Sequence, residues 1–181
     1  MNRLLSTLDY QSVDCWISLG FAGGLAPDLK TGDILEGSTV RTPQGDIRAS
    51  ATGSREEKAS SPLLYCAECV ISTPREKREL YVKTGASAVD LESAAVAEHA
   101  GNRCEPFAWI RVISDAADEV VPPVLSQSIG EDGFPSTRAA VRVLAKQPWH
   151  LPLLLRHARR SHRCGMLLAV SATRWLERFE A

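Results

Sequence analysis

Two carboxylates follow apolar runs of the sequence at points where the secondary structure is expected to change. Glu92 stands at the end of a short apolar stretch that enters a predicted helix. Asp115 follows Ser114 at the end of residues 107–113, whose largely apolar side chains are typical of a buried strand. In open α/β sheets, ligands bind just beyond the carboxyl ends of strands. The two acids are therefore predicted to reach one small molecule in an enzyme site.

The chemistry suited to such a pair is acid catalysis on a bound sugar derivative. Asp115, oriented by Ser114, could protonate a leaving group, which contributes about 10²–10⁴-fold to a rate. Glu92 could accept hydrogen bonds from sugar hydroxyls, because a carboxylate is an acceptor at both oxygens. Structural explanations remain open for these acids. Asp115 could cap the turn after its strand, Asp90 could cap a helix, and Glu92 could be an acid favoured by the helix dipole.

The composition is that of an ordinary globular protein and excludes several classes of function. Of the 181 residues, 44% are hydrophobic and 24% charged, and the net charge of −1 gives no electrostatic basis for a nucleic-acid partner. Five cysteines, an odd number, predict free thiols in a reducing compartment. Cys66 and Cys69 have the spacing of half a zinc site, but no second pair follows, so no metal is predicted. Without a signal-peptide pattern or an apolar run of about 18 residues, the protein is predicted to be cytoplasmic.

Predicted strands and helices alternate along the chain. Thr73, Pro74 and Glu76 have the pattern of a helix start, with a threonine cap, a proline in the first turn and a capping-box glutamate. The three glycines of residues 20–24 predict a sharp turn. Further strands are predicted at 15–19, from 32, at 63–72 and at 107–113. The end of a helix is predicted at 1–10, and further helices at 92–99, 137–146 and 151–179. A polar surface excursion is predicted at 41–61 and a loop at 120–136. This alternation predicts an α/β domain with a partly parallel sheet.

Three ordered segments resemble one known family, the nucleoside phosphorylase/nucleosidase superfamily. Residues 20–35 look like its glycine turn and following strand, residues 89–93 like its ribose-binding segment, and residues 111–118 like its base-protonating segment. Residues 73–80, 121–123 and 147–154 resemble the hopanoid-associated branch, which is thought to release adenine from adenosylhopane. The resemblance implies that residues 1–181 are one domain with a central mixed sheet flanked by helices, lacking the first strands.

The resemblance also implies the composition of the site. The site would bind a nucleoside, which in the hopanoid branch is linked to a lipid. It would need no cofactor or metal. Relatives are usually dimers or larger, so a homo-oligomer is expected. The catalytic residues carried over are Asp115 and Ser114, and the substrate-binding residues are Glu92, Leu91, Asp90, Ala22, Gly23 and Val70.

Two departures from the family pattern bear on the reaction. Ser18 and Phe21 stand where phosphorylases of the superfamily hold phosphate, so transfer to water is predicted rather than transfer to phosphate. Relatives also have further strands before the counterpart of Cys15, which supply the acid that activates water. Either the true start lies upstream, or this chain is a fragment, and residues 1–181 alone are expected to have little or no hydrolase activity. A nucleosidase acting on methylthioadenosine or S-adenosylhomocysteine, and a non-catalytic remnant that binds nucleosides or protein partners, are the alternatives.

The tail of the chain is basic. Residues 151–163 contain four arginines, two histidines and no acid, and four leucines precede the first arginine. The segment is either an ordinary helix whose leucines pack on the sheet, or a basic amphipathic helix in peripheral contact with an anionic membrane. The second interpretation places Arg156, Arg159, Arg160 and Arg163 against lipid headgroups, with Trp149 and the leucines beside an apolar channel.

Overall fold

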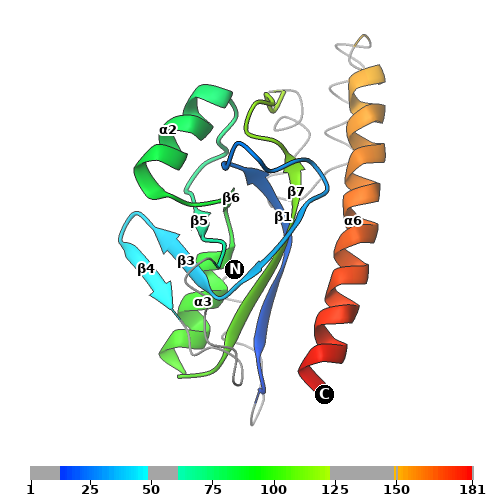
Figure 1. The fold of residues 1–181 in the computed structure, drawn as a ribbon. Coiled ribbons are helices and arrows are strands. Elements are labelled where there is room, and N and C mark those ends of the chain that lie inside the picture. The colour runs from blue at the N-terminus through cyan, green and yellow to red at the C-terminus, as the bar shows by residue number, and fades with distance from the viewer. Residues whose placement is uncertain (1–12, 49–60, 123–148, 150, 181) are drawn as a thin grey trace.

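The computed structural model describes residues 13–48, 61–122, 149 and 151–180. In this part of the chain, seven strands form one mixed sheet in the order β2-β7-β1-β6-β5-β3-β4 (Figure 1). The strands are β1 (Trp16–Gly24), β2 (Ile34–Gly37), β3 (Thr39–Thr42), β4 (Gly45–Arg48), β5 (Leu64–Cys66), β6 (Ala88–Asp90) and β7 (Phe107–Asp115). The helices are α2 (Pro74–Thr84), α3 (Ser93–Asn102) and α6 (Leu151–Glu180). A mixed sheet flanked by helices confirms the predicted fold class.

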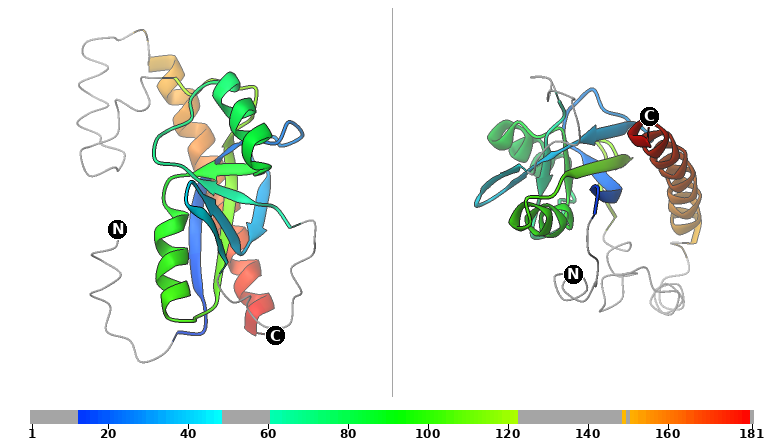
Figure 2. Two further views of the ribbon diagram at one scale, coloured as in Figure 1. Left: turned by 90° about the vertical axis from the view of Figure 1, so that its left-hand side faces the viewer. Right: turned by 90° about the horizontal axis from the view of Figure 1, so that it is seen from below.

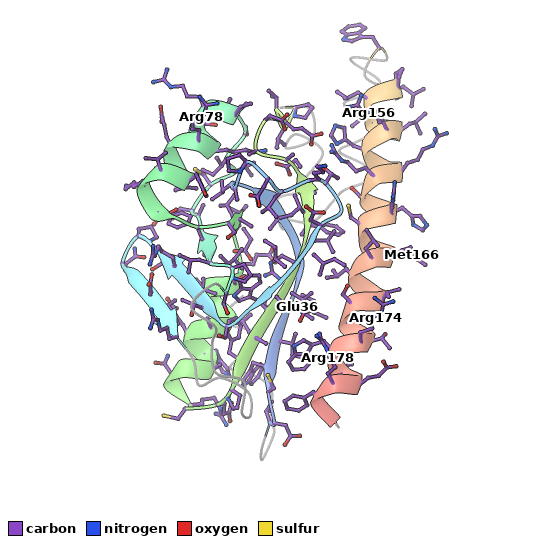
Figure 3. The ribbon with its side chains drawn as sticks, viewed as in Figure 1. Glu36, Arg78, Arg156, Met166, Arg174 and Arg178 are labelled. Carbon is purple, nitrogen blue, oxygen red and sulfur yellow. The ribbon has the colours of Figure 1, made fainter. Side chains whose placement is uncertain are left out.

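The helices lie on both sides of the sheet. α6 runs along one side against β7, β1 and β2, and α3 packs from the other side against β1, β3, β4 and β7 (Figures 1 and 2). Cys164 and Ser171 lie on the buried face of α6. Near its end, Arg178 donates to Glu36 of β2 at 2.8 Å, and both side chains are labelled in Figure 3. None of the helices in the described ranges is long and apolar enough to cross a membrane.

Strand β7 carries the predicted acid at its end. It pairs in parallel with β1 and antiparallel with β2, and residues 107–113 are all buried. Phe107, Trp109 and Ile113 belong to the main hydrophobic core. The apolar run is needed because a strand paired on both sides and covered by helices meets apolar neighbours on both faces. Its last residue, Asp115, is thereby fixed at the edge of the core.

Helix α2 begins where the sequence predicts, and both of its ends are capped. The hydroxyl of Thr73 accepts from the Glu76 backbone N–H at 3.2 Å, and the Glu76 carboxylate accepts from the Thr73 N–H at 2.9 Å. This is the complete capping box, and it satisfies two N–H groups that the helix cannot pair internally. At the other end Gly85 adopts φ 67°, and its N–H donates to the Tyr81 carbonyl at 2.8 Å. A glycine takes this left-handed conformation without the cost that a Cβ would add.

Three predictions about local structure were wrong. Residues 20–24 form the last part of β1, because glycine here serves close side-chain packing: a Cβ at Gly23 would lie 3.2 Å from Asp115 Oδ2. Part of the excursion predicted at 41–61 is paired as the β3–β4 hairpin. The strand predicted at 63–72 is limited to β5, Leu64–Cys66. The helices predicted at 1–10 and 137–146, and most of the loop at 120–136, lie outside the described residues.

Candidate functional site

A cavity of about 410 Å³ lies beside the C-terminal parts of β1, β6 and β7. Its walls come from four regions of the chain: residues 20–23, residues 69–71, residues 89–92, and Arg111, Ser114 and Asp115 of β7, with Val121 beside them. Its size is within the range of small-molecule sites, about 300–1,000 Å³. All eight residues predicted for the site line this cavity: Ala22, Gly23, Val70, Asp90, Leu91, Glu92, Ser114 and Asp115. The structure thus brings them together, while their individual roles remain predictions.

Asp115 reaches the cavity from a break in the pairing of β1 with β7. Ala22 is opposite Ile113 and Gly23 is opposite Asp115, so the register skips Ser114. Such an irregularity re-aims side chains at the end of a strand. Ser114 Oγ donates to Asp115 Oδ1 at 2.6 Å, in keeping with its predicted orienting role. The Asp115 side chain is 17% exposed, and it lies in the cavity wall.

The other oxygen of Asp115 has a partner that the sequence analysis did not identify. Lys77 Nζ, from α2, donates to Asp115 Oδ2 at 2.5 Å, and the Lys77 side chain is fully buried. One signal was present in the sequence. Lys77 shares its helix face with Leu80, Tyr81 and Thr84, at the spacing of a face that packs inward. A lysine on such a face requires a buried partner, because an unpaired buried ammonium is costly.

Glu92 offers an uncommitted carboxylate at the same cavity. It occupies the N-cap position of α3, yet its side chain makes no capping hydrogen bond. Within the described residues no hydrogen bond or ion pair engages this carboxylate, and the residue is exposed. Its position near the helix N-terminus is compatible with the dipole explanation as well. A ligand hydroxyl in the cavity could therefore bind Glu92 without displacing a protein group.

Asp90 is committed to the protein. Arg111 Nε and Nη2 donate to Asp90 Oδ2 at 2.9 and 2.6 Å, and the Ser93 hydroxyl donates to the same oxygen. The Ser93 N–H also points to Asp90 Oδ1 at 3.5 Å, a long contact at the start of α3. Arg111 also donates to the Ser18 hydroxyl and to the Ser18 carbonyl, each at 2.7 Å. This geometry favours a structural role for the Asp90 carboxylate, although the residue borders the cavity.

Apolar side chains and one thiol complete the lining. Phe21, Val70 and Leu91 are large apolar residues that are 41–47% exposed, as a surface that receives an aromatic or aliphatic ligand would be. Cys69 is free, exposed and in the cavity wall, whereas burial raises the pKa of the Cys66 thiol to about 11. In the described ranges no three His, Cys, Asp or Glu side chains gather as metal ligands.

Comparison with known proteins identifies relatives of the fold. No protein-family model matches the chain. A proposed methylthioadenosine nucleosidase from Weissella paramesenteroides matches with a TM-score of 0.53 at 22% identity, over 81% of this chain and 74% of that one. The 5'-methylthioadenosine/S-adenosylhomocysteine nucleosidase of Helicobacter pylori, bound to a pyrrolopyrimidine ligand, matches with a TM-score of 0.51 at 22% identity, over 77% and 69%.

A futalosine hydrolase mutant from Helicobacter pylori matches with a TM-score of 0.52 at 19% identity, over 62% of this chain and 64% of that one. Two of these proteins are named as nucleosidases and the third as a hydrolase. At such identities the comparison establishes a shared fold, and the activity of this chain has to be argued from its own residues.

Proposed function

We propose that the protein binds a purine nucleoside in this cavity and hydrolyses its N-glycosidic bond, with adenine as the released base. The observation that supports this most directly is the placement of two different carboxylates on one cavity. Asp115 is paired with Ser114 and Lys77, while Glu92 is uncommitted within the described residues. An acid for the leaving group and an acceptor for the sugar are two of the groups that this reaction requires; in relatives, an acid from strands before the counterpart of Cys15 activates the water.

The reaction is limited by the poor leaving ability of the purine. Asp115 would donate a proton to the base as the C–N bond breaks, so that neutral adenine leaves, and Ser114 would hold the carboxyl in orientation. Positive charge then develops on the ribose ring. Glu92 would accept hydrogen bonds from the ribose hydroxyls, and these strengthen as the ring becomes positive. Phe21 and Leu91 supply apolar surface near the glycosidic bond.

Water is the proposed acceptor of the ribosyl group. Among the described residues that line the cavity, Arg111 is the one cationic side chain, and it already donates to Asp90, Ser18 and Ser93. The hydroxyl of Ser18, at a position where phosphorylases hold phosphate, is likewise bound to Arg111. A phosphate dianion would thus meet no uncommitted cation among the described lining residues.

For the substrate we favour adenosylhopane, on the resemblance of residues 73–80 and 121–123 to the hopanoid-associated branch and on the exposed apolar rim formed by Phe21, Val70 and Leu91. Methylthioadenosine is the second candidate, because two of the structures that share the fold are named as nucleosidases of this substrate. We further propose a cytoplasmic homo-oligomer that works without cofactor or metal.

Adenine release and nucleoside binding together test this proposal. Purified protein is incubated with adenosylhopane in detergent, methylthioadenosine and adenosine, and free adenine is quantified. In parallel, alkylation of Cys69 is followed with and without a non-cleavable pyrrolopyrimidine nucleoside, because Cys69 borders the cavity. Release from adenosylhopane alone supports the lipid substrate, and release from methylthioadenosine supports the alternative. Protection of Cys69 without adenine release identifies a non-catalytic binder. If neither protection nor adenine release is observed, the proposal is overturned.

Replacing Glu92 with glutamine is expected to slow adenine release by about 10–100-fold, since a hydrogen bond to a charged group contributes about 1.5–3 kcal/mol. A neutral amide is a weaker partner for a sugar that becomes positive. The rate is measured with saturating ribosyl substrate. Glu98→Gln, an exposed change on the same helix, is the matched control. An unaltered rate for Glu92→Gln would remove the ribose-binding role.

The structure revises the proposed membrane contact. Arg160 does not face outward with Arg156, Arg159 and Arg163: its guanidinium donates to both oxygens of Glu119, at 2.7 and 2.6 Å. Arg156, Arg159 and Arg163 are exposed, and exposed Met166 follows them along the helix. Figure 3 shows Arg156 and Met166 on the side of α6 away from the sheet. We therefore propose that this narrower face contacts anionic lipid.

Vesicle sedimentation tests the contact. Each basic residue near an anionic surface contributes on the order of 1 kcal/mol, so replacing Arg156, Arg159 and Arg163 with serine should weaken binding about 100-fold. Binding is also expected to fall in high salt. Serine at Arg75 and Arg78, which are exposed on α2, provides the control. Equal binding to neutral and anionic vesicles, or none at low salt, would contradict the membrane contact.

A further inference from the structure

Lys77 is a buried cation whose donors are all directed at one end of the site. Its Nζ donates to Asp115 Oδ2 at 2.5 Å, to the Ala116 carbonyl at 2.6 Å and to the Glu119 carbonyl at 3.0 Å. The side chain is 0% exposed. An ammonium has three protons to donate, and each has one acceptor here. The residue thus connects α2 to Asp115 and to the turn that follows it.

We propose that Lys77 is the positioning residue of the Asp115 acid, and that its charge stabilises the carboxylate that Asp115 becomes when it protonates the purine. This inference rests on the proposed function. A positive charge beside a carboxyl group favours its ionised form. As the proton passes from Asp115 to the base, negative charge grows on the aspartate, and a fixed ammonium at 2.5 Å lowers the energy of that state.

The positive charge of Lys77 has a second, opposing effect, because only the protonated form of a carboxyl group can act as the acid. A cation beside a carboxyl group also disfavours the protonated form, which is the form that donates the proton. Loss of the charge should therefore lower the maximum rate and move the alkaline decline of activity to higher pH. A residue that only supports the fold would lower activity without moving the pH dependence in this direction.

Several other charged or titratable groups of the described residues lie around Asp115, and none of them contacts it as Lys77 does. Across the cavity Arg111 forms an ion pair with Asp90, and Glu92 and Cys69 lie in the cavity wall. On the side of α6, Arg160 neutralises Glu119, and burial lowers the pKa of His157, which Asp115 and Glu119 partly offset. None of these groups donates to Asp115, so Lys77 is the cation in direct contact with it among the described residues.

The first experiment compares pH profiles of adenine release. Lys77→Gln removes the charge and retains a donor, Lys77→Arg retains the charge, and Lys83→Gln alters an exposed lysine of the same helix as the control. Lys77→Gln is expected to lower the maximum rate at least tenfold and to move the alkaline decline upward by about one pH unit. Lys77→Arg should keep the decline near that of the unchanged protein even if its maximum falls. An unshifted decline in folded Lys77→Gln would overturn the proposal.

The second experiment needs no turnover. A pyrrolopyrimidine nucleoside analogue carries an N–H at the position of the purine nitrogen that would be protonated, so it prefers Asp115 as a carboxylate. Lys77→Gln should weaken its binding at neutral pH at least tenfold, and Lys77→Arg and Lys83→Gln should weaken it less. Equal affinities in all variants would overturn the role of Lys77. If the unchanged protein binds the analogue but releases no adenine, catalysis fails separately. If it does neither, the proposed function falls, and the inference with it.

Discussion

Replacing Asp115 with asparagine should lower adenine release by about 10²–10⁴-fold, the usual contribution of a general acid. Asparagine keeps the size of the side chain and removes the proton that would be transferred to the purine. Its amide oxygen can still accept from Lys77 Nζ, and its amide nitrogen can face Ser114 Oγ. The contacts that hold the end of β7 are therefore retained, and substrate affinity should change much less than the rate.

The stability of this variant needs a separate measurement. Removing one partner of a buried ion pair can cost about 3–5 kcal/mol, and Lys77 is fully buried. The partial exposure of Asp115 and the two remaining carbonyl acceptors of Lys77 should reduce this cost. Urea unfolding therefore accompanies the rate measurement, with Ser114→Ala as a milder change at the same place. Near-normal turnover of a folded Asp115→Asn protein would exclude Asp115 as the acid.

Local sequence patterns predicted the parts of the fold and site that depend on neighbouring residues. The capping box of Thr73 and Glu76 spans three positions, and the apolar run before Asp115 is continuous in the chain. Parallel pairing of β1 with β7 then carries Ala22 and Gly23 to Ser114 and Asp115. The convergence of the predicted residues on one cavity follows from these local features and from the resemblance.

The parts that were missed depend on contacts between distant residues. Lys77 meets Asp115 across 38 positions, and its own helix has no pattern that specifies which acid it will pair with. Arg160 was grouped with Arg156, Arg159 and Arg163, but it lies at the edge of the helix face that these residues share, where it can reach Glu119. The glycines at 20–24 were assigned to a turn because glycine permits turns, whereas here they make room for side chains of β7.

Replacing Arg111 with methionine should reduce the free energy of unfolding by about 3–5 kcal/mol, because the Asp90 carboxylate would remain buried without its cation. The two side chains are only 2% and 5% exposed, so water cannot replace the lost partner. The hydroxyl oxygens of Ser18 and Ser93 would also lose the hydrogen bonds that they accept from Arg111. The change is measured by urea denaturation, followed by circular dichroism.

Two controls separate the buried pair from arginine loss in general. Arg178→Met removes a pair with Glu36 whose side chains are 47% and 35% exposed, and such a surface pair contributes about 0–1 kcal/mol. Asp90→Asn combined with Arg111→Met should recover part of the loss, because it removes the unpaired charge as well, and a double-mutant cycle gives the coupling between them. If Arg111→Met cost no more than Arg178→Met, the pair would not anchor the cavity wall. A large cost with partial recovery would instead show that Asp90 serves the structure, which leaves Glu92 as the carboxylate available to the ribose.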